Sequence, residues 1–81
     1  MTHPTVTPLT ALAEGQGGIL DHITGGTAVS ERLSSMGFVP GVALSILRRQ
    51  GSGPVLVMVG SSRIAIGRGM ADKVMVLIDR D

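Results

Sequence analysis

Residues 32–41 read Arg-Leu-Ser-Ser-Met-Gly-Phe-Val-Pro-Gly and combine the end of a helix with a tight turn. Gly37 suits the position just after a helix, where the backbone takes a positive φ, and Phe38 can then pack back on the last helical turn. Pro40 and Gly41 suit the second and third positions of a type II turn, because proline presets φ and glycine accepts a positive φ. The stretch therefore predicts a sharp reversal of the chain between a helix and a strand.

The residues before this reversal predict the one clear helix of the chain, over residues 27–36. Val29, Leu33 and Met36 are spaced i, i+4 and i+7, so they form a single apolar stripe on such a helix. Thr27 is expected to cap its first turn, since a threonine side chain can accept a hydrogen bond from an unpaired helical N–H.

Beyond the helix the apolar period is two, which is the period of a strand. Short antiparallel strands joined by glycine-rich turns, too few for a sandwich, close best as a small barrel, because closure removes unpaired edges. The predicted fold class is mainly β: a small antiparallel barrel of about five strands with one three-turn helix and short helical turns. The five predicted strands cover residues 19–24, 42–47, 55–59, 62–66 and 74–78.

The 81 residues suffice for one small domain, and 43% of them are apolar. Residues 1–8 contain three threonines and two prolines and predict a flexible, extended tail, so the domain is expected over residues 9–81. Two brief helical turns are expected within it, near residues 9–13 and 70–72. No apolar run approaches the roughly 20 residues of a membrane span, and no targeting segment is visible, so a cytoplasmic protein without membrane insertion is expected.

The composition disfavours several classes of function. The chain has no cysteine, which excludes a disulfide scaffold, a thiol nucleophile and a cysteine-based zinc finger. Its single aromatic residue offers no stacking platform for bases, and a net charge of +1 does not suggest many phosphate contacts. The glycine-rich loops lack the Lys-Ser/Thr pair of a phosphate-binding loop. A nucleic-acid-binding barrel therefore stays only as an alternative.

No catalytic or metal site is predicted. His3 and His22 are the only histidines, and His3 lies in the predicted tail. In the strand over residues 19–24, Leu20 and His22 are expected on one face and Asp21 on the other, so His22 has no orienting carboxylate. We therefore expect no enzyme, no cofactor and no intrinsic metal site, with His22 and Asp21 only as weak surface ligands that could hold an ion between two copies.

The remaining candidates for function are basic. Six of the seven Lys and Arg residues are arginines, whose planar guanidinium suits carboxylate and phosphate partners. Arg48, Arg49 and Arg63 lie near the ends of neighbouring predicted strands and could form a patch for an acidic partner surface. The alternative is a solvated rim that supplies solubility.

A set of residues spread over most of the chain keeps a characteristic order and spacing: Leu9, Leu12, Gly15, Arg32-Leu33, Met36-Gly37-Phe38, Pro40-Gly41, Leu44, Arg48, Gly53-Pro54, Ile64-Ala65-Ile66 and Ala71. This set resembles the FeoA family of ferrous-iron transport proteins. The resemblance implies an SH3-like barrel and a cytosolic accessory role toward FeoB, a membrane iron transporter with a cytoplasmic GTP-binding domain. It implies no intrinsic iron site. Residues 67–70, Gly-Arg-Gly-Met, depart from the more basic stretch expected there.

Loops held by a rigid scaffold are the usual place of binding residues. The reversal is therefore the first candidate surface, with Gly37 and Gly41 as structural turn residues. A dimerisation module without a dedicated partner, forming at most a weak homodimer, remains a further alternative. The residues expected to contact a protein partner are Arg32, Met36, Phe38, Val39, Pro40, Arg48 and Arg49.

Overall fold

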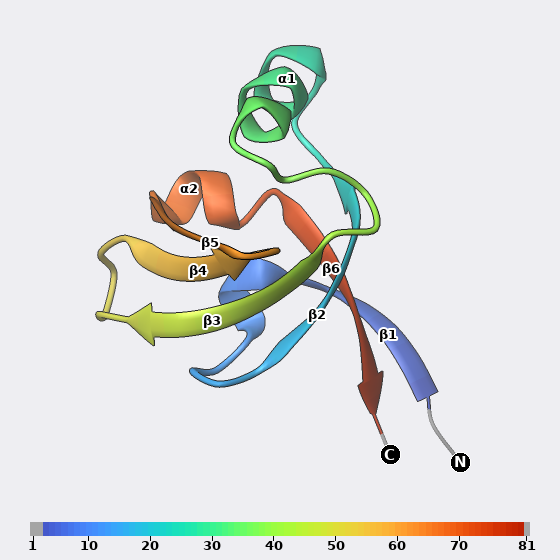
Figure 1. The fold of residues 1–81 in the computed structure, drawn as a ribbon, viewed down its shortest axis with the longest axis vertical. Coiled ribbons are helices and arrows are strands. Elements are labelled where there is room, and N and C mark those ends of the chain that lie inside the picture. Colours follow the sequence, from blue (N-terminus) through green and yellow to red (C-terminus); the bar gives the residue numbers. More distant parts are fainter. Residues whose placement is uncertain (1–2, 81) are drawn as a thin grey trace.

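Six antiparallel strands form one continuous, strongly bent sheet in the computed structural model, which describes residues 3–80 (Figure 1). The spatial order is β1-β6-β2-β3-β4-β5. The strands are β1 His3–Pro8, β2 Gly17–Ile23, β3 Ala43–Arg49, β4 Val55–Val59, β5 Ser62–Ile66 and β6 Val74–Arg80. The helical elements are the 3₁₀ turn η1 Leu9–Ala11, α1 Thr27–Ser35 and the one-turn α2 Arg68–Ala71.

The predicted mainly β, antiparallel class is confirmed, with two differences. There are six strands where about five were expected, and no ladder among residues 3–80 joins β5 to β1, so the sheet stays open instead of closing into a full barrel. The bounds of β4 and β5 agree with the prediction to the residue. Both brief helical turns are present as η1 and α2.

The prediction of a flexible tail is wrong for residues 3–8. They form β1, which pairs with β6 from His3 opposite Arg80 to Pro8 opposite Met75. Threonine and proline both favour extended backbone, and a proline is tolerated on an edge strand because its missing N–H is not needed by a second neighbour. The first two residues of the predicted tail lie outside the described part of the chain.

β2 is the strand about which the sheet bends. It pairs with β6 on one side and with the start of β3 on the other. A Cβ at Gly17 would collide with the carbonyl oxygen of Leu44, and one at Gly18 with that of Leu77. Only glycine therefore lets the neighbouring strands approach this closely at the bend.

A β-bulge in β2 overturns the predicted assignment of its faces. The register with β6 shifts between Leu20 and His22, which leaves Asp21 as the extra residue. Leu20 is 1% exposed and Ile23 packs against the core, whereas His22 is exposed. Leu20 and His22 consequently lie on opposite faces, since the bulge adds a residue to the strict period of two.

The reversal after α1 has the geometry that the sequence predicts. Gly37 has φ +97°, its N–H donates to the carbonyl of Ser34 at 3.0 Å, and the N–H of Phe38 donates to that of Leu33 at 3.0 Å. These two bonds form a Schellman motif, which satisfies carbonyls that the helix end would leave unpaired. At the other end of α1 the N-cap is Gly26, so the prediction of Thr27 as cap is wrong by one residue.

The type II turn that follows is also confirmed. The N–H of Val42 donates to the carbonyl of Val39 at 3.1 Å, and Gly41 has φ +92°. The turn is tied to β2, because the N–H of Gly41 donates to the carbonyl of Leu20 and the N–H of Leu20 donates to that of Val42. The reversal is therefore held on both sides, by the helix end and by the sheet.

Fourteen buried apolar residues make up the core inside the bent sheet. No polar or charged residue is buried among the described residues. Met36 and Val29, from the predicted apolar stripe of the helix, are partly buried against this cluster. The core consists of Leu9, Leu12, Leu20, Leu33, Phe38, Leu44, Ile46, Val55, Val57, Val59, Ile66, Ala71, Val74 and Val76.

Replacing Gly37 with alanine should destabilise the protein by about 1–2 kcal/mol, because a residue with a Cβ resists a positive φ. The added Cβ would meet Val59 at an ordinary distance of 3.6 Å, so the loss comes from the backbone and not from a clash. Gly69→Ala is the matched control, since Gly69 lies in α2 with open space around its Cβ position and should keep or slightly raise stability. Equal denaturation midpoints for the two variants would contradict the prediction.

Candidate protein-interaction surfaces

The reversal presents one apolar side chain to solvent. Val39 is 42% exposed, and Pro40 and Gly41 beside it are also exposed. Phe38, which was expected to contact a partner, is 0% exposed, and Met36 is half-buried. Phe38 therefore serves the core, and Val39 with Pro40 is what a partner would meet at this corner.

Arg32 lies on the last turn of α1 and is exposed, as the predicted contact residue requires. A cation there complements the partial negative charge at the C-terminal end of a helix. Its backbone carbonyl accepts a hydrogen bond from the Ser35 hydroxyl at 2.7 Å. Arg32 and Val39 thus come from the two sides of one rigid reversal.

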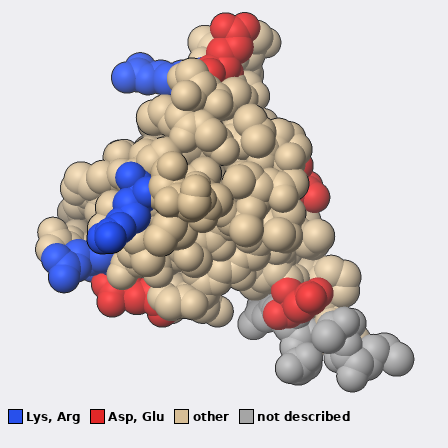
Figure 2. Space-filling model, in the orientation of Figure 1, with Lys and Arg blue, Asp and Glu red and all other residues tan. Residues whose placement is uncertain are grey.

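Charge is distributed unevenly over the chain. Residues 32–71 contain five arginines and no aspartate or glutamate. This stretch includes β3, β4, β5 and α2, which are neighbours in the fold. In Figure 2 most of the blue atoms lie on the side that holds these strands in Figure 1, and further blue atoms project beside α1.

Two of the three arginines of the predicted basic patch share a face of the sheet. Arg48 of β3 pairs with Leu56 of β4, which in turn pairs with Ala65 of β5. Arg63 of β5 pairs with Met58 of β4, two residues further along that strand. Arg48 and Arg63 are exposed, on the face opposite the buried side chains of β4. They lie two strands and two residues apart, at roughly 12 Å between Cα atoms.

The third, Arg49, is bound into the structure. Its Nη1 donates to the carbonyl of Leu12 at 2.5 Å, and its backbone N–H donates to Oε2 of Glu14 at 2.8 Å. Successive strand residues point to opposite faces, so Arg49 turns toward the segment after η1 while Arg48 points to solvent. Arg49 therefore supports the structure, and of the two adjacent arginines Arg48 is the one that faces solvent.

The reversal and the arginines of β3 are two separate places. Val39 and Pro40 precede β3, whereas Arg48 lies near its other end. At about 3.3 Å per residue, the seven residues of the strand set the two places roughly 20 Å apart. A small contact would use one of them and not both.

His22 does have an acidic neighbour, contrary to the prediction. Its Nδ1 lies 2.7 Å from Oδ2 of Asp21, and the two side chains are 53% and 42% exposed. The bulge in β2 explains this, because it removes the alternation that would have separated them. His3 lies exposed on β1. Within residues 3–80, no group of three or more His, Cys, Asp or Glu side chains gathers for a metal ion.

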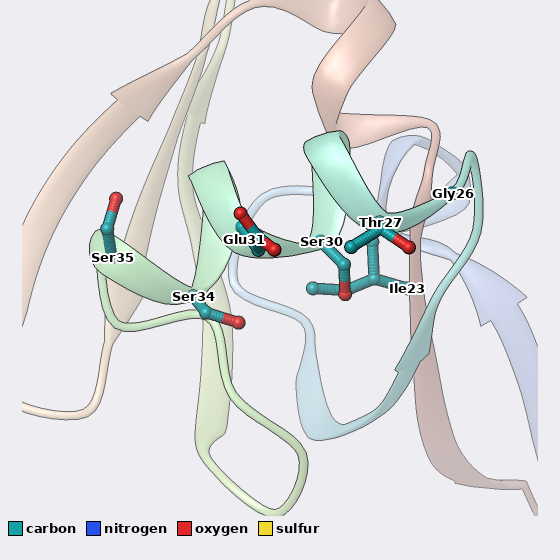
Figure 3. A pocket seen from close by; sticks show the side chains of 7 residues that line it. All are labelled: Ile23, Gly26, Thr27, Ser30, Glu31, Ser34 and Ser35. Carbon is teal, nitrogen blue, oxygen red and sulfur yellow. The ribbon is translucent and has the colours of Figure 1, made fainter.

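A shallow hollow of about 720 Å³ runs along α1 (Figure 3). Nothing in the sequence had marked it. Its lining is mostly small hydroxyl-bearing residues, with Glu31 as the one charged side chain. The lining residues are Ile23, Gly26, Thr27, Ser30, Glu31, Ser34 and Ser35.

Comparison with known proteins gives consistent matches. The FeoA domain model matches residues 7–77. A protein of Methanocaldococcus jannaschii described as a putative Fe(2+) transport protein A is 44% identical over 69 residues, which are 85% of this chain and 83% of that protein. No helix in the described part of the chain has the length and apolar character needed to cross a membrane.

Solved structures match as well. A crystal structure of an iron uptake regulatory protein, FeoA, has TM-score 0.84 and 39% identity, and the match covers 91% of this chain and 100% of that one. FeoA of Stenotrophomonas maltophilia in complex with zinc has TM-score 0.69 and 27% identity, over 80% of this chain and 82% of that one. The latter is described as a procaryotic SH3 domain protein, which confirms the predicted SH3-like class. A manganese-dependent transcriptional repressor, 22% identical with TM-score 0.83, shares the fold over 42% of its own chain.

The different roles of the adjacent arginines predict different effects on stability. Arg49→Ala should lower the free energy of unfolding by about 1–2 kcal/mol, because the Leu12 carbonyl loses a charged hydrogen-bond donor. Arg48→Ala should change it by less than about 0.5 kcal/mol, as expected for an exposed side chain. Urea denaturation of both variants measures the difference. If Arg48→Ala were the more damaging change, the assignment of Arg49 would be wrong.

Proposed function

Because the chain belongs to the FeoA family, we propose that it assists ferrous iron transport by binding the cytoplasmic GTP-binding domain of an FeoB-like membrane transporter. The observation that carries this proposal is the match of the FeoA domain model to residues 7–77. The likeness to a protein described as an Fe(2+) transport protein supports the same role. The chain would act in the cytoplasm as a protein-binding module, without chemistry of its own.

The reversal is the surface we assign to this contact. Its backbone is fixed by the Schellman motif and by the hydrogen bonds to β2, so Val39 is presented without a large loss of conformational freedom on binding. An exposed apolar side chain can exclude water from a contact, and arginine is enriched among the residues that carry most of the binding energy. Arg32, exposed on α1, supplies that charge.

The structure gives further reason to disfavour nucleic-acid binding. Single-stranded nucleic acids bind through exposed aromatic side chains on which bases stack. Phe38 is the only aromatic residue of the chain, and it is 0% exposed. Basic side chains alone would give weak binding without base contacts.

A second candidate, self-association, is favoured by one specific observation. Val6, Leu77 and Ile19 pair across β1, β6 and β2, and their exposed fractions are 41%, 36% and 43%. A shallow hollow of about 320 Å³ lies beside Ile19 and Leu77. This row is an apolar patch on the outer surface of the sheet, which a second copy could cover.

Binding to the transporter domain should weaken at least about tenfold in Val39→Asp and in Arg32→Glu, since each removes an interfacial contact worth at least roughly 1.4 kcal/mol. Calorimetric titration against the cytoplasmic domain of the cognate transporter measures the change, after circular dichroism has shown both variants folded. Arg48→Glu is the control at the distant end of β3 and should bind as the parent does. Loss in Arg48→Glu with full binding by the other two would place the interface on the arginines of the sheet.

The self-association candidate predicts a weak dimer, because three side chains are far fewer than the roughly 20–30 residues a side of a stable interface. Sedimentation equilibrium should detect dimer only toward about millimolar concentration. Leu77→Glu should abolish it, whereas Val39→Asp should leave it unchanged. A tight dimer that survives Leu77→Glu would show that the row is not the contact.

A further inference from the structure

The open sheet leaves β5 as an edge strand with backbone groups directed outward. Within residues 3–80, β5 pairs only with β4. Gly60 and Ser61 join the two strands as a two-residue turn, with Val59 opposite Ser62. Residues that flank such a turn form a hydrogen-bonded pair, and from there non-hydrogen-bonded and hydrogen-bonded pairs alternate along the two strands. The N–H and C=O groups of Arg63 and Ala65 consequently point away from β4.

The opposite edge of the sheet is protected in a way that β5 is not. β1 carries Pro4 and Pro8, which lack a backbone N–H and obstruct the approach of a further strand. β5 contains no proline, and its side chains at Arg63 and Ala65 are exposed. Of the two edges, β5 is therefore the one that can accept another strand.

The charge around this edge favours one kind of partner. Arg63 lies on β5 itself, and Arg48 lies on the same exposed face two strands away. Arg68 follows the strand, and its Nη1 donates to the carbonyl of Gly51 at 2.6 Å, at the end of β5 away from the Gly60 turn. With no acidic residue between Glu31 and Asp72, carboxylates are the complementary partner groups.

We propose that the β5 edge binds an extended acidic segment of a partner protein as an added strand. Backbone hydrogen bonds to Arg63 and Ala65 would hold the segment, as in other cases of strand addition. Side chains of a strand alternate between faces, so acidic residues at every second position would lie on the face of Arg63 and Arg48. This rests on the proposed role as a protein-binding module, and it adds a second contact that is separate from the one at the reversal.

The edge also adjoins the reversal. A Cβ at Gly60 would lie 3.7 Å from Val42, and one at Gly37 would lie 3.6 Å from Val59, so the β4–β5 turn packs beside the corner that presents Val39. The corner and the β5 edge are therefore neighbouring but separate surfaces, and each is tested by its own variants.

The test uses the whole chain, labelled with ¹⁵N, and the peptide Ac-Glu-Thr-Glu-Val-Glu-Thr-Glu-NH₂. We expect the peptide to shift the amide resonances of Arg63 and Ala65 and to slow their hydrogen exchange. The same peptide with lysine in place of glutamate should do neither at equal concentration. Binding of neither peptide, an equal response to both, or shifts spread over the whole surface would overturn the proposal. The proposed transporter contact would stand in that case, because it is measured separately.

Two variants and one control complete the test. Ala65→Pro removes an outward N–H without removing a bond to β4, and should weaken peptide binding at least about tenfold. Arg63→Glu should weaken it similarly and leave the fold intact, which keeps the test decisive if Ala65→Pro does not fold. Lys73→Glu changes the net charge by the same amount beside Gly25, which follows β2, and should bind as the parent does. Unchanged binding in Arg63→Glu, or equal loss in Lys73→Glu, would contradict strand addition at this edge.

Discussion

The positive φ of Gly37 is the constraint on which the rest of the structure depends. It lets the N–H groups of Gly37 and Phe38 reach back to the last turn of α1, and in doing so it directs Phe38 inward. Phe38 is the largest core side chain and the only aromatic one, so its position decides how the aliphatic residues pack around it. The same reversal delivers the chain to β3 in register with β2, through the bonds at Leu20.

Features that depend on neighbouring residues could be predicted from the sequence, whereas features that depend on pairing between distant segments could not. The helix end, the type II turn and the strands β4 and β5 are set by neighbouring residues, and all were predicted. β1 was missed because its threonines and prolines carry no apolar alternation, and it exists only because β6 offers an edge for it. The bulge at Asp21 was missed for the same reason, since a bulge is defined by the register of two strands.

The same distinction between local and long-range features applies to the predicted contact residues. Arg32, Val39 and Arg48 are exposed, as an exposed turn, a helix end and a strand end suggest. Phe38 and Arg49 are not available, because one fills the core and the other binds a carbonyl 37 residues away. From the sequence alone an aromatic residue and an arginine are good candidates for interface anchors. Only the fold shows that the side chains of Phe38 and Arg49 already make contacts within the chain.

An open sheet of six strands has two edge strands, and the two edges of this sheet are protected in different ways. β1 has prolines, which prevent pairing whatever the partner. β5 has an arginine, which repels copies of itself and other basic strands but attracts an acidic one. An arginine therefore protects an edge strand only against some partner strands, whereas a proline protects it against all of them. Residues 32–71 contain no acidic residue, and none of their five arginines is buried in the core. The combination of a selective edge and a one-sided charge favours the proposed recognition of a partner over a role in solubility alone, because aspartate and glutamate raise solubility more than arginine does.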